Sequence, residues 1–498
     1  MKKLIVLRRF SQLLFLGLFI YILWSTTYPL NGLLPVETFF KTNPLTMIFT
    51  SISERIAIPG IMYALAMLLL ALLLGRYFCG WVCPLGSMID AAGALRKRRP
   101  VLADLSNAIM RKPKFAILAI IAVLSIFGMQ AAWVFDPIVI MARFVSLNLI
   151  PTVTLIADNA FISVLTDHNI EPLFDLYRGL KSSILGIKVY YFDNSLFIFL
   201  FFLAAAGSAM FISRLWCRAV CPLGALYSII AKGSLVERDI NGCTHCLKCK
   251  SICRMGAIKD DISYVKGECI LCMDCVYECP GNITSFKIAP RKQDTANKLQ
   301  PISRKDFIFL LFSSFFLLGF GKKGSIPGNV IRPPGSLRED MFSNRCIRCG
   351  NCMKVCITNG LQPIMLQAGL AALWTPQLVC EIGYCEYNCT LCGNVCPTGA
   401  IPKLQVDKKR KTRLGLAQID RSLCIPWAYN SDCIVCQEHC PVGQKAIKLD
   451  EYVAANGKKI YRPRVDDKLC IGCGICQNKC PVRPVRAIRV NPGQSDRG

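Results

Sequence analysis

The chain has 498 residues, of which 53 % are hydrophobic, and its mean hydropathy is +0.41. This composition argues against an ordinary soluble enzyme and favours a membrane protein with several domains. The chain also has 29 cysteines against three histidines (His168, His245 and His439), a ratio that argues against haem and most zinc enzymes. The formal net charge of +27 suggests a nucleic acid or an anionic membrane surface as a partner.

Four uncharged apolar stretches are long enough to cross a bilayer as helices. They are residues 10–28, 56–75, 115–135 and 195–213. The first follows basic residues and could be a cleaved signal peptide, but no small-residue cleavage site follows, so we interpret it as an anchor. A fifth apolar run, residues 144–157, is broken by Pro151. We expect this run to be interfacial or re-entrant, with a fifth membrane span as the alternative.

The charges of the connecting loops predict the orientation, because cytoplasmic loops collect Lys and Arg. The N-terminus is basic, and the loop after the second stretch carries Arg76, Arg96, Lys97, Arg98, Arg99, Arg111, Lys112 and Lys114. Residues 136–194 carry six acidic residues against four basic ones. We therefore predict that the N-terminus and the loop after the second stretch are cytoplasmic, and that residues 136–194 lie outside.

The inner ends of the second and fourth stretches carry two similar short motifs, CGWVCPLG at residues 79–86 and CRAVCPLG at residues 217–224. An iron–sulfur cluster usually needs four protein ligands, and each motif supplies two. Because both motifs are predicted on the same side of the membrane, Cys79, Cys83, Cys217 and Cys221 can meet as one shared cluster site. The alternative is two pairs of redox-active or structural thiols.

After residue 240 the cysteines form six runs of four. The spacing C-x2-C-x2-C-x3-C reflects how a loop wraps a [4Fe-4S] cubane, in which three cysteines bind one cluster and the fourth binds its neighbour. Four runs match this spacing strictly, and the runs that begin at Cys385 and Cys424 have a longer first gap. The runs come in pairs, so we predict three two-cluster modules.

Exchange of the fourth cysteine within each pair predicts six ligand sets, which we name after their first member. The sets are Cys243, Cys246, Cys249 and Cys279; Cys269, Cys272, Cys275 and Cys253; Cys346, Cys349, Cys352 and Cys396; Cys385, Cys389, Cys392 and Cys356; Cys424, Cys433, Cys436 and Cys480; and Cys470, Cys473, Cys476 and Cys440. The cofactors predicted are therefore six [4Fe-4S] clusters, and a seventh if the half-motif cysteines (the Cys79 set) share one.

Disulfides and structural zinc are the alternatives for these cysteines. Disulfide scaffolds belong to small secreted domains with irregular spacing, and six tandem runs of this pattern are not typical of zinc. Each cluster with four thiolates carries about two negative charges, so six of them offset about 12 of the positive charges. We therefore expect no nucleic-acid partner. Cys380 belongs to no run, and we interpret it as a buried thiol.

One apolar run separates the first module from the other two. Residues 303–321 begin with SRKDF, which resembles a twin-arginine export signal whose second arginine is a lysine. The uncharged core is short for a membrane span and typical of a signal sequence. The alternative is an apolar helix that lies against the membrane or in a domain core.

These patterns predict a multi-domain membrane protein. We expect an α-helical bundle of four or five transmembrane helices and three α+β ferredoxin-like two-cluster modules. The predicted boundaries are residues 1–235 for the transmembrane domain, 236–290 for module 1, 291–321 for a linker with the export-like segment, 322–408 for module 2 and 409–498 for module 3.

The half-motifs, the spans and module 1 resemble NapH, the membrane quinol-dehydrogenase component of periplasmic nitrate reduction, and its methylamine-oxidation relative MauN. The segments RPPGSLREDMFSNRCIRCGNCMKVC and YCEYNCTLCGNVCPTGAI are similar to the exported polyferredoxins NapG and MauM. The chain therefore resembles a fusion of the two. The resemblance implies quinol oxidation at the cell (inner) membrane and electron delivery to a periplasmic redox enzyme or carrier.

On this basis we expect a multi-pass membrane polyferredoxin, with residues 236–290 in the cytoplasm and residues 322–498 on the outer, periplasmic face. Its partners would be quinol or quinone, a redox enzyme or electron carrier, and the membrane. The alternative is a cluster-bearing regulator or maturation factor for a partner reductase or dehydrogenase. Asp90 and Asp136 are candidate proton acceptors for quinol, and solvated loop charges are the alternative for both.

Overall fold

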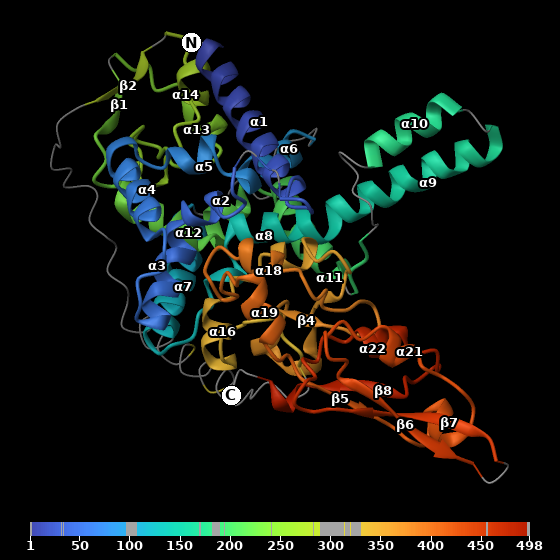
Figure 1. The fold of residues 1–498 in the computed structure, drawn as a ribbon. Coiled ribbons are helices and arrows are strands. Elements are labelled where there is room, and N and C mark those ends of the chain that lie inside the picture. The colour runs from blue at the N-terminus through green and yellow to red at the C-terminus, as the bar shows by residue number, and fades with distance from the viewer. Residues whose placement is uncertain are drawn as a thin grey trace. The chain divides into compact units, whose positions relative to one another are not determined.

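The computed structural model describes residues 2–30, 32, 34–95, 107–168, 171–181, 190–193, 195–240, 242–281, 283–288, 313, 319, 330–454 and 457–495. The chain divides into two compact units (Figure 1). Unit 1 comprises Met1–Trp24, Leu34–Val145 and Leu196–Lys322, and unit 2 comprises Ser25–Leu33, Ser146–Ser195 and Lys323–Gly498. The predicted export-like segment, residues 303–321, lies outside the described residues except for positions 313 and 319.

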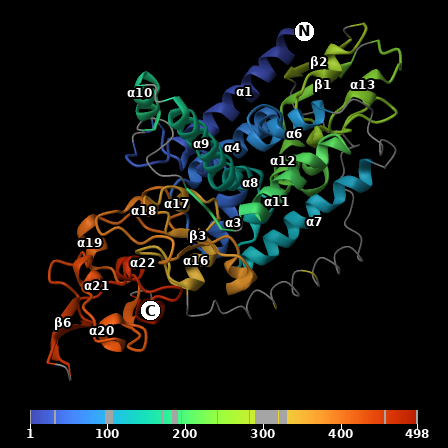
Figure 2. The same cartoon turned by 90° about the vertical axis from the view of Figure 1, so that its right-hand side faces the viewer.

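Unit 1 is mainly helical. Its helices are α1 (Lys2–Trp24), α2 (Thr38–Lys41), α3 (Pro44–Glu54), α4 (Ile61–Leu74), α5 (Tyr77–Trp81), α6 (Pro84–Ala94), α7 (Asn107–Ile126), α8 (Pro137–Phe144), α11 (Ser195–Gly207) and α12 (Pro222–Ala231). Proline occupies the start of α3, α6, α8 and α12, where its missing N–H has no helical partner to lose. Helix α12 packs against α4 and α7, and Figure 2 shows α7 and α12 side by side.

The segment predicted as module 1 completes unit 1. Strand β1 (Val236–Ile240) pairs antiparallel with β2 (Thr284–Ile288), so that Val236 lies opposite Ile288. Between the strands lie two short helices, α13 (Lys248–Ile252) and α14 (Asp274–Tyr277). The first and last strands therefore close this segment on itself.

The apolar helices differ in length from the predicted spans. Within the part of the chain that the structure describes, two helical segments, Lys3–Trp24 and Pro137–Thr166, are long and apolar enough to cross a membrane. Helices α4 and α11 have 14 and 13 residues, because Gly60 and Gly75 bound α4, and a 3-10 turn follows Gly207. Both helices nevertheless present apolar side chains outward, including Met62 and Leu69 on α4 and Leu196 on α11. Such exposed apolar faces are unusual for a protein in water.

The helical segment continues through Pro151, whereas the sequence predicts a break there. A π-helical stretch, Val145–Leu149, precedes α9 (Ile150–His168), so Pro151 is the second residue of α9 and directly follows a wide turn. The wider turn accommodates the absent N–H and the proline ring. The apolar run is thus part of the longer helical segment Pro137–Thr166.

Unit 2 contains α9, which packs against α10 (Glu171–Leu180), and the segments predicted as modules 2 and 3. The module 2 segment has helices α16 (Glu339–Arg345), α17 (Asn351–Lys354), α18 (Leu391–Asn394) and α19 (Val406–Lys411) and the antiparallel pair β3 (Leu361–Pro363) and β4 (Pro376–Leu378). The β3–β4 pair lies between the two cysteine runs and occupies the insert that separates them.

The module 3 segment is closed by β5 (Leu416–Ile419) and β8 (Ile488–Asn491), which pair antiparallel as β1 and β2 do. It also contains α20 (Ile425–Ala428), α21 (Val435–Glu438) and α22 (Ile475–Lys479). A hairpin of β6 (Ile447–Val453) and β7 (Lys459–Val465) extends from it, as Figure 1 shows.

Candidate metal centres

The backbone of the four strict runs has one feature in common. In each run the residues immediately before and after the second cysteine have positive φ: His245 and Leu247, Leu271 and Met273, Arg348 and Gly350, and Gly472 and Gly474. Left-handed residues alternating with right-handed ones turn successive N–H groups toward one point and form an anion-binding concavity, as at many iron–sulfur sites. The strict spacing therefore folds into loops suited to a negatively charged cluster.

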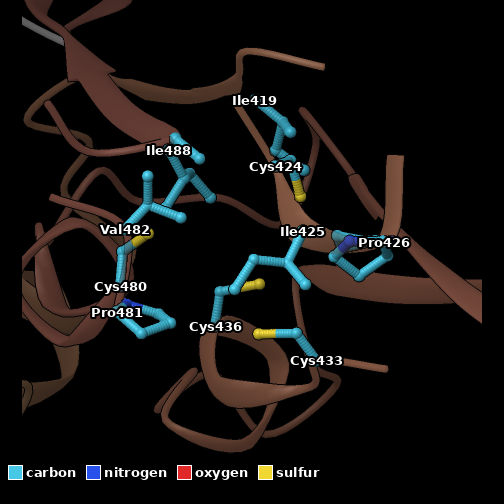
Figure 3. A pocket seen from close by; sticks show the side chains of 12 residues that line it. Ile419, Cys424, Ile425, Pro426, Cys433, Cys436, Cys480, Pro481, Val482 and Ile488 are labelled. Carbon is cyan, nitrogen blue, oxygen red and sulfur yellow. The ribbon is translucent and has the colours of Figure 1, made fainter. Parts of the chain in front are cut away.

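Five of the six predicted ligand sets each line one cavity. The Cys269, Cys346, Cys385, Cys424 and Cys470 sets do so, each with its fourth cysteine drawn from the partner run. Figure 3 shows the side chains of Cys424, Cys433, Cys436 and Cys480 pointing toward a common space. The four members of the Cys243 set line none of these cavities; Cys249 is buried and Cys246 is exposed.

The cavities fit a polynuclear cluster. Their walls are apolar: Ile419, Pro426, Val482 and Ile488 surround the thiols of the Cys424 set. Within the described residues, no three His, Cys, Asp or Glu side chains are gathered around a point as a single metal ion requires. Four thiols around an apolar cavity, with backbone N–H groups turned inward, are the ligands and surroundings of an iron–sulfur cluster.

The electrostatics of the thiols favour a positively charged centre. Burial, with the neighbouring thiols, raises the pKa of Cys424 to about 11 and that of Cys473 to about 12. Buried thiols of this kind stay neutral unless a cation compensates the thiolate charge. Iron in the cavity would supply that compensation, because a coordinated thiol is deprotonated.

The ligand sets of unit 2 are connected in space in an order that differs from the chain. The amide of Cys385 donates a hydrogen bond of 2.8 Å to the carbonyl of Cys473, which joins the Cys385 and Cys470 sets directly. The thiols of Cys352 and Cys392 interact electrostatically, as do those of Cys476 and Cys436. The spatial order is therefore the Cys346, Cys385, Cys470 and Cys424 sets.

Cys380 is buried, as predicted, and is 4 % exposed. Its sulfur lies beside Gly474, where a Cβ would come within 2.4 Å of it. Any larger residue at position 474 would displace this thiol, so the positive φ and the close approach both require glycine there.

The two half-motifs lie together in unit 1. Cys79, Cys83, Cys217 and Cys221 are all buried, and the thiol of Cys221 interacts electrostatically with the other three. Arg76, which the charge pattern counts among the loop charges, is buried at this site, and so is Arg214. Each arginine stands three residues before the first cysteine of its motif, and this shared spacing is the sequence signal for their common role.

Neither Asp90 nor Asp136 is a solvated loop charge. Asp90 forms a 2.7 Å ion pair with Arg214 and a longer one with Arg254, and despite burial these cations hold its pKa well below the usual range. Asp136 caps α8 by accepting hydrogen bonds from the amides of Ile138 and Val139 and from Asn43. Burial raises the pKa of Asp136 to about 6.

Four thiols around each of several cavities, carried on loops of ferredoxin spacing, define an iron–sulfur electron-transfer protein of the ferredoxin type. Family models agree with this class: a 4Fe-4S binding domain matches residues 56–101 and 194–241, and a 4Fe-4S dicluster domain matches residues 431–483. The first match covers both half-motifs. No solved structure matches the chain.

Relatives refine the class. The ferredoxin-type protein NapG of Escherichia coli is 35 % identical over 169 residues, which cover 33 % of this chain and 71 % of NapG. The methylamine utilization ferredoxin-type protein MauM of Methylorubrum extorquens is 34 % identical over 166 residues, which cover 33 % and 73 %. An uncharacterized protein of Methanocaldococcus jannaschii, MJ0750, is 27 % identical over 297 residues, 59 % of this chain and all of that protein. Through a third of its length, the chain belongs to the NapG/MauM family of ferredoxin-type proteins.

Proposed function

We propose that this protein is a membrane-bound polyferredoxin that accepts electrons from quinol and passes them to a partner redox enzyme or carrier. The observation that carries the proposal is the connected series of cysteine sets in unit 2, joined by the hydrogen bond from Cys385 to Cys473. Bound [4Fe-4S] clusters supply one-electron oxidation and reduction with little rearrangement. The chain's own residues would hold the clusters one after another in space and exclude water from them.

The segments around module 1 support a cytoplasmic position for residues 236–290. Trp81 donates a 3.0 Å hydrogen bond to the carbonyl of Leu271, Arg111 donates to the carbonyl of Gly256, and Arg8 lies 3.8 Å from Asp274. Arg8 and Arg111 belong to the basic segments that the charge pattern predicts to be inside. Module 1 thus contacts the segments expected at the cytoplasmic surface.

Module 2 contacts a different group of segments. Lys354 donates a 2.9 Å hydrogen bond to the carbonyl of Thr26, and Asn359 donates one of 2.8 Å to that of Tyr191. Thr26 follows the first apolar helix, and Tyr191 belongs to the acidic segment 136–194 that the charge pattern predicts to be outside. These contacts favour an outer position for residues 322–498.

A reporter enzyme that is active only outside the cytoplasm tests this position. Fused after residue 498, it should be active, whereas the same reporter inserted at Gly242, in module 1, should be inactive. An active reporter at Gly242 or an inactive one after residue 498 would contradict the proposed arrangement.

Quinol reduction tests the activity. The full chain, purified without oxygen and placed in lipid vesicles, should contain at least about 24 iron and 24 sulfide for six sets of four. Mixing with a quinol analogue should produce the paramagnetic resonance signals of reduced clusters within seconds, whereas the corresponding quinone should not. Reduction by a strong chemical reductant but not by any quinol would exclude quinol as the donor.

A further inference from the structure

We propose that Cys79, Cys83, Cys217 and Cys221 together hold one [4Fe-4S] cluster, and that this site exchanges single electrons directly with the Cys269 set. The electron-carrying role rests on the proposed function, whereas the site itself rests on the geometry of unit 1. No covalent bond changes in such an exchange; one site is oxidised as the other is reduced.

Each half-motif is hydrogen-bonded to the arginine that precedes the other; we call this pair of contacts the reciprocal brace. Arg214 donates a 2.8 Å hydrogen bond from Nη1 to the carbonyl of Cys79, and Arg76 donates a 3.4 Å hydrogen bond from Nη2 to the carbonyl of Cys217. Each arginine thus fixes the first cysteine of the other motif. Because both contacts are reciprocal, the motifs form the two halves of one pseudo-symmetric site.

The second cysteines have equivalent positions. Cys83 and Cys221 are the N-caps of α6 and α12, and their sulfurs accept hydrogen bonds of 3.4 and 3.3 Å from the amides of Gly86 and Gly224. The N-terminus of a helix favours negative charge and so stabilises a thiolate. A Cβ on Gly224 would come within 2.7 Å of Arg76, so the glycine of the motif leaves room for the brace.

The burial of the four thiols and a nearby tyrosine hydroxyl also fit a cluster at this site. Cys79, Cys83, Cys217 and Cys221 are between 4 % and 8 % exposed, and the thiol of Cys221 interacts electrostatically with the other three. The hydroxyl of Tyr227, which is fully buried, has no hydrogen-bond partner among the described residues and interacts electrostatically with Cys79 and Cys83. A cluster would give it a sulfur acceptor.

The loop of the Cys269 set lies directly on the first half-motif. A Cβ on Gly80 would come within 2.3 Å of the carbonyl oxygen of Ile270, so the two backbones are in contact. Trp81 also donates a hydrogen bond to the carbonyl of Leu271. Ile270 and Leu271 lie between the ligands Cys269 and Cys272, and Gly80 and Trp81 lie between Cys79 and Cys83. The Gly80–Ile270 contact and the hydrogen bond from Trp81 to Leu271 therefore give short paths for electrons between the two sites.

Iron and sulfide analysis of the full chain tests the site. The unaltered protein should hold about 28 iron and 28 sulfide, since seven sites contain four each. The variant Cys79→Ala should lose about four of each, and Cys79→Ala/Cys217→Ala should lose no more, because both cysteines serve one cluster. The control Cys380→Ala, which removes a buried thiol outside every set, should lose none.

Three results would overturn the shared site. They are a content of about 24 iron in the unaltered protein, an unchanged content in Cys79→Ala, and a loss of about eight in the double variant, which would mean one cluster for each half-motif. The unaltered protein decides the first point even if a variant fails to fold. The remaining resonance signals show whether the other clusters of a variant are intact.

The site and the proposed function can fail separately. If the seventh cluster is present but no quinol reduces the protein, the site stands and the donor is wrong. If quinol reduces a protein with about 24 iron, the function stands and the shared site is wrong. Gly80→Ala tests the exchange itself: it should keep all the iron but slow the electron transfer between the Cys79 and Cys269 sets, and an unchanged rate would exclude this path.

Discussion

Replacing Glu268 by alanine should destabilise unit 1 by about 3–5 kcal/mol, because it removes the shared partner of two buried cations. Glu268 forms ion pairs of 2.7 Å with Arg76 and 2.6 Å with Lys114 and accepts a 3.1 Å hydrogen bond from Ser228. Burial alone would raise the pKa of Glu268, but Arg76 and Lys114 lower it, so the carboxylate is charged in the folded protein. The measurement is the free energy of unfolding of unit 1 in denaturant.

Two variants distinguish the loss of a buried carboxylate from the loss of an exposed salt bridge. Asp260→Ala removes the partner of Lys250, but the Asp260 side chain is 83 % exposed, so the cost should be below about 1 kcal/mol. Glu268→Gln/Lys114→Met removes one buried cation together with the anion and should recover part of the lost stability. Equal costs for Glu268→Ala and Asp260→Ala would show that the buried network does not hold unit 1 together.

Removing Cys476 should isolate the Cys424 set from electrons that enter at the Cys346 set, whereas removing Cys436 should leave the other three sets connected. The reason is the spatial order in unit 2, where the hydrogen bond from Cys385 to Cys473 places the Cys470 set before the Cys424 set. We place the electron entry at the Cys346 set in this proposal, because Gly350 in its loop packs against Leu147, which belongs to the candidate membrane helix Pro137–Thr166.

Rapid freezing after mixing with quinol, followed by paramagnetic resonance, measures this order. In Cys476→Ala the Cys424 signal should develop at least about tenfold more slowly, which corresponds to roughly 1.4 kcal/mol of activation free energy. In Cys436→Ala the Cys470 signal should develop at the unaltered rate, which provides the matched control. The opposite pattern, with the Cys470 signal delayed in Cys436→Ala, would mean that electrons follow the order of the chain.

The grouping of cysteines around five cavities could be predicted from sequence because ligand spacing is a local property. The exchange of the fourth cysteine between runs gives the sets that line the five cavities, such as Cys356 with the Cys385 set. The order of the sets could not be predicted, since the two runs of a module are nearly equivalent in sequence. That order depends on which loop meets the next module, and the contact between Cys385 and Cys473 is a tertiary one.

The burial of charged residues could not be predicted from the sequence. Arg76 and Lys114 count as loop charges in a topology prediction, yet both are fully buried against Glu268. A positive residue near a membrane helix end has the same sequence signature whether it faces water or a buried carboxylate. The predicted spans 56–75 and 195–213 are longer than helices α4 and α11, because hydropathy does not detect the glycines and the 3-10 turn that bound these helices.

The reciprocal brace of Arg76 and Arg214 also bears on biogenesis. The first half-motif is complete when residue 86 has been synthesised, but its partner cysteines and the second arginine are added only after about 130 further residues. A nascent chain that ends before Arg214 would contain only two of the four cysteines of the proposed site. In the proposed shared site, cluster insertion would have to wait until both motifs have folded together, and a truncation before Arg214 would leave Cys79 and Cys83 without their partner ligands.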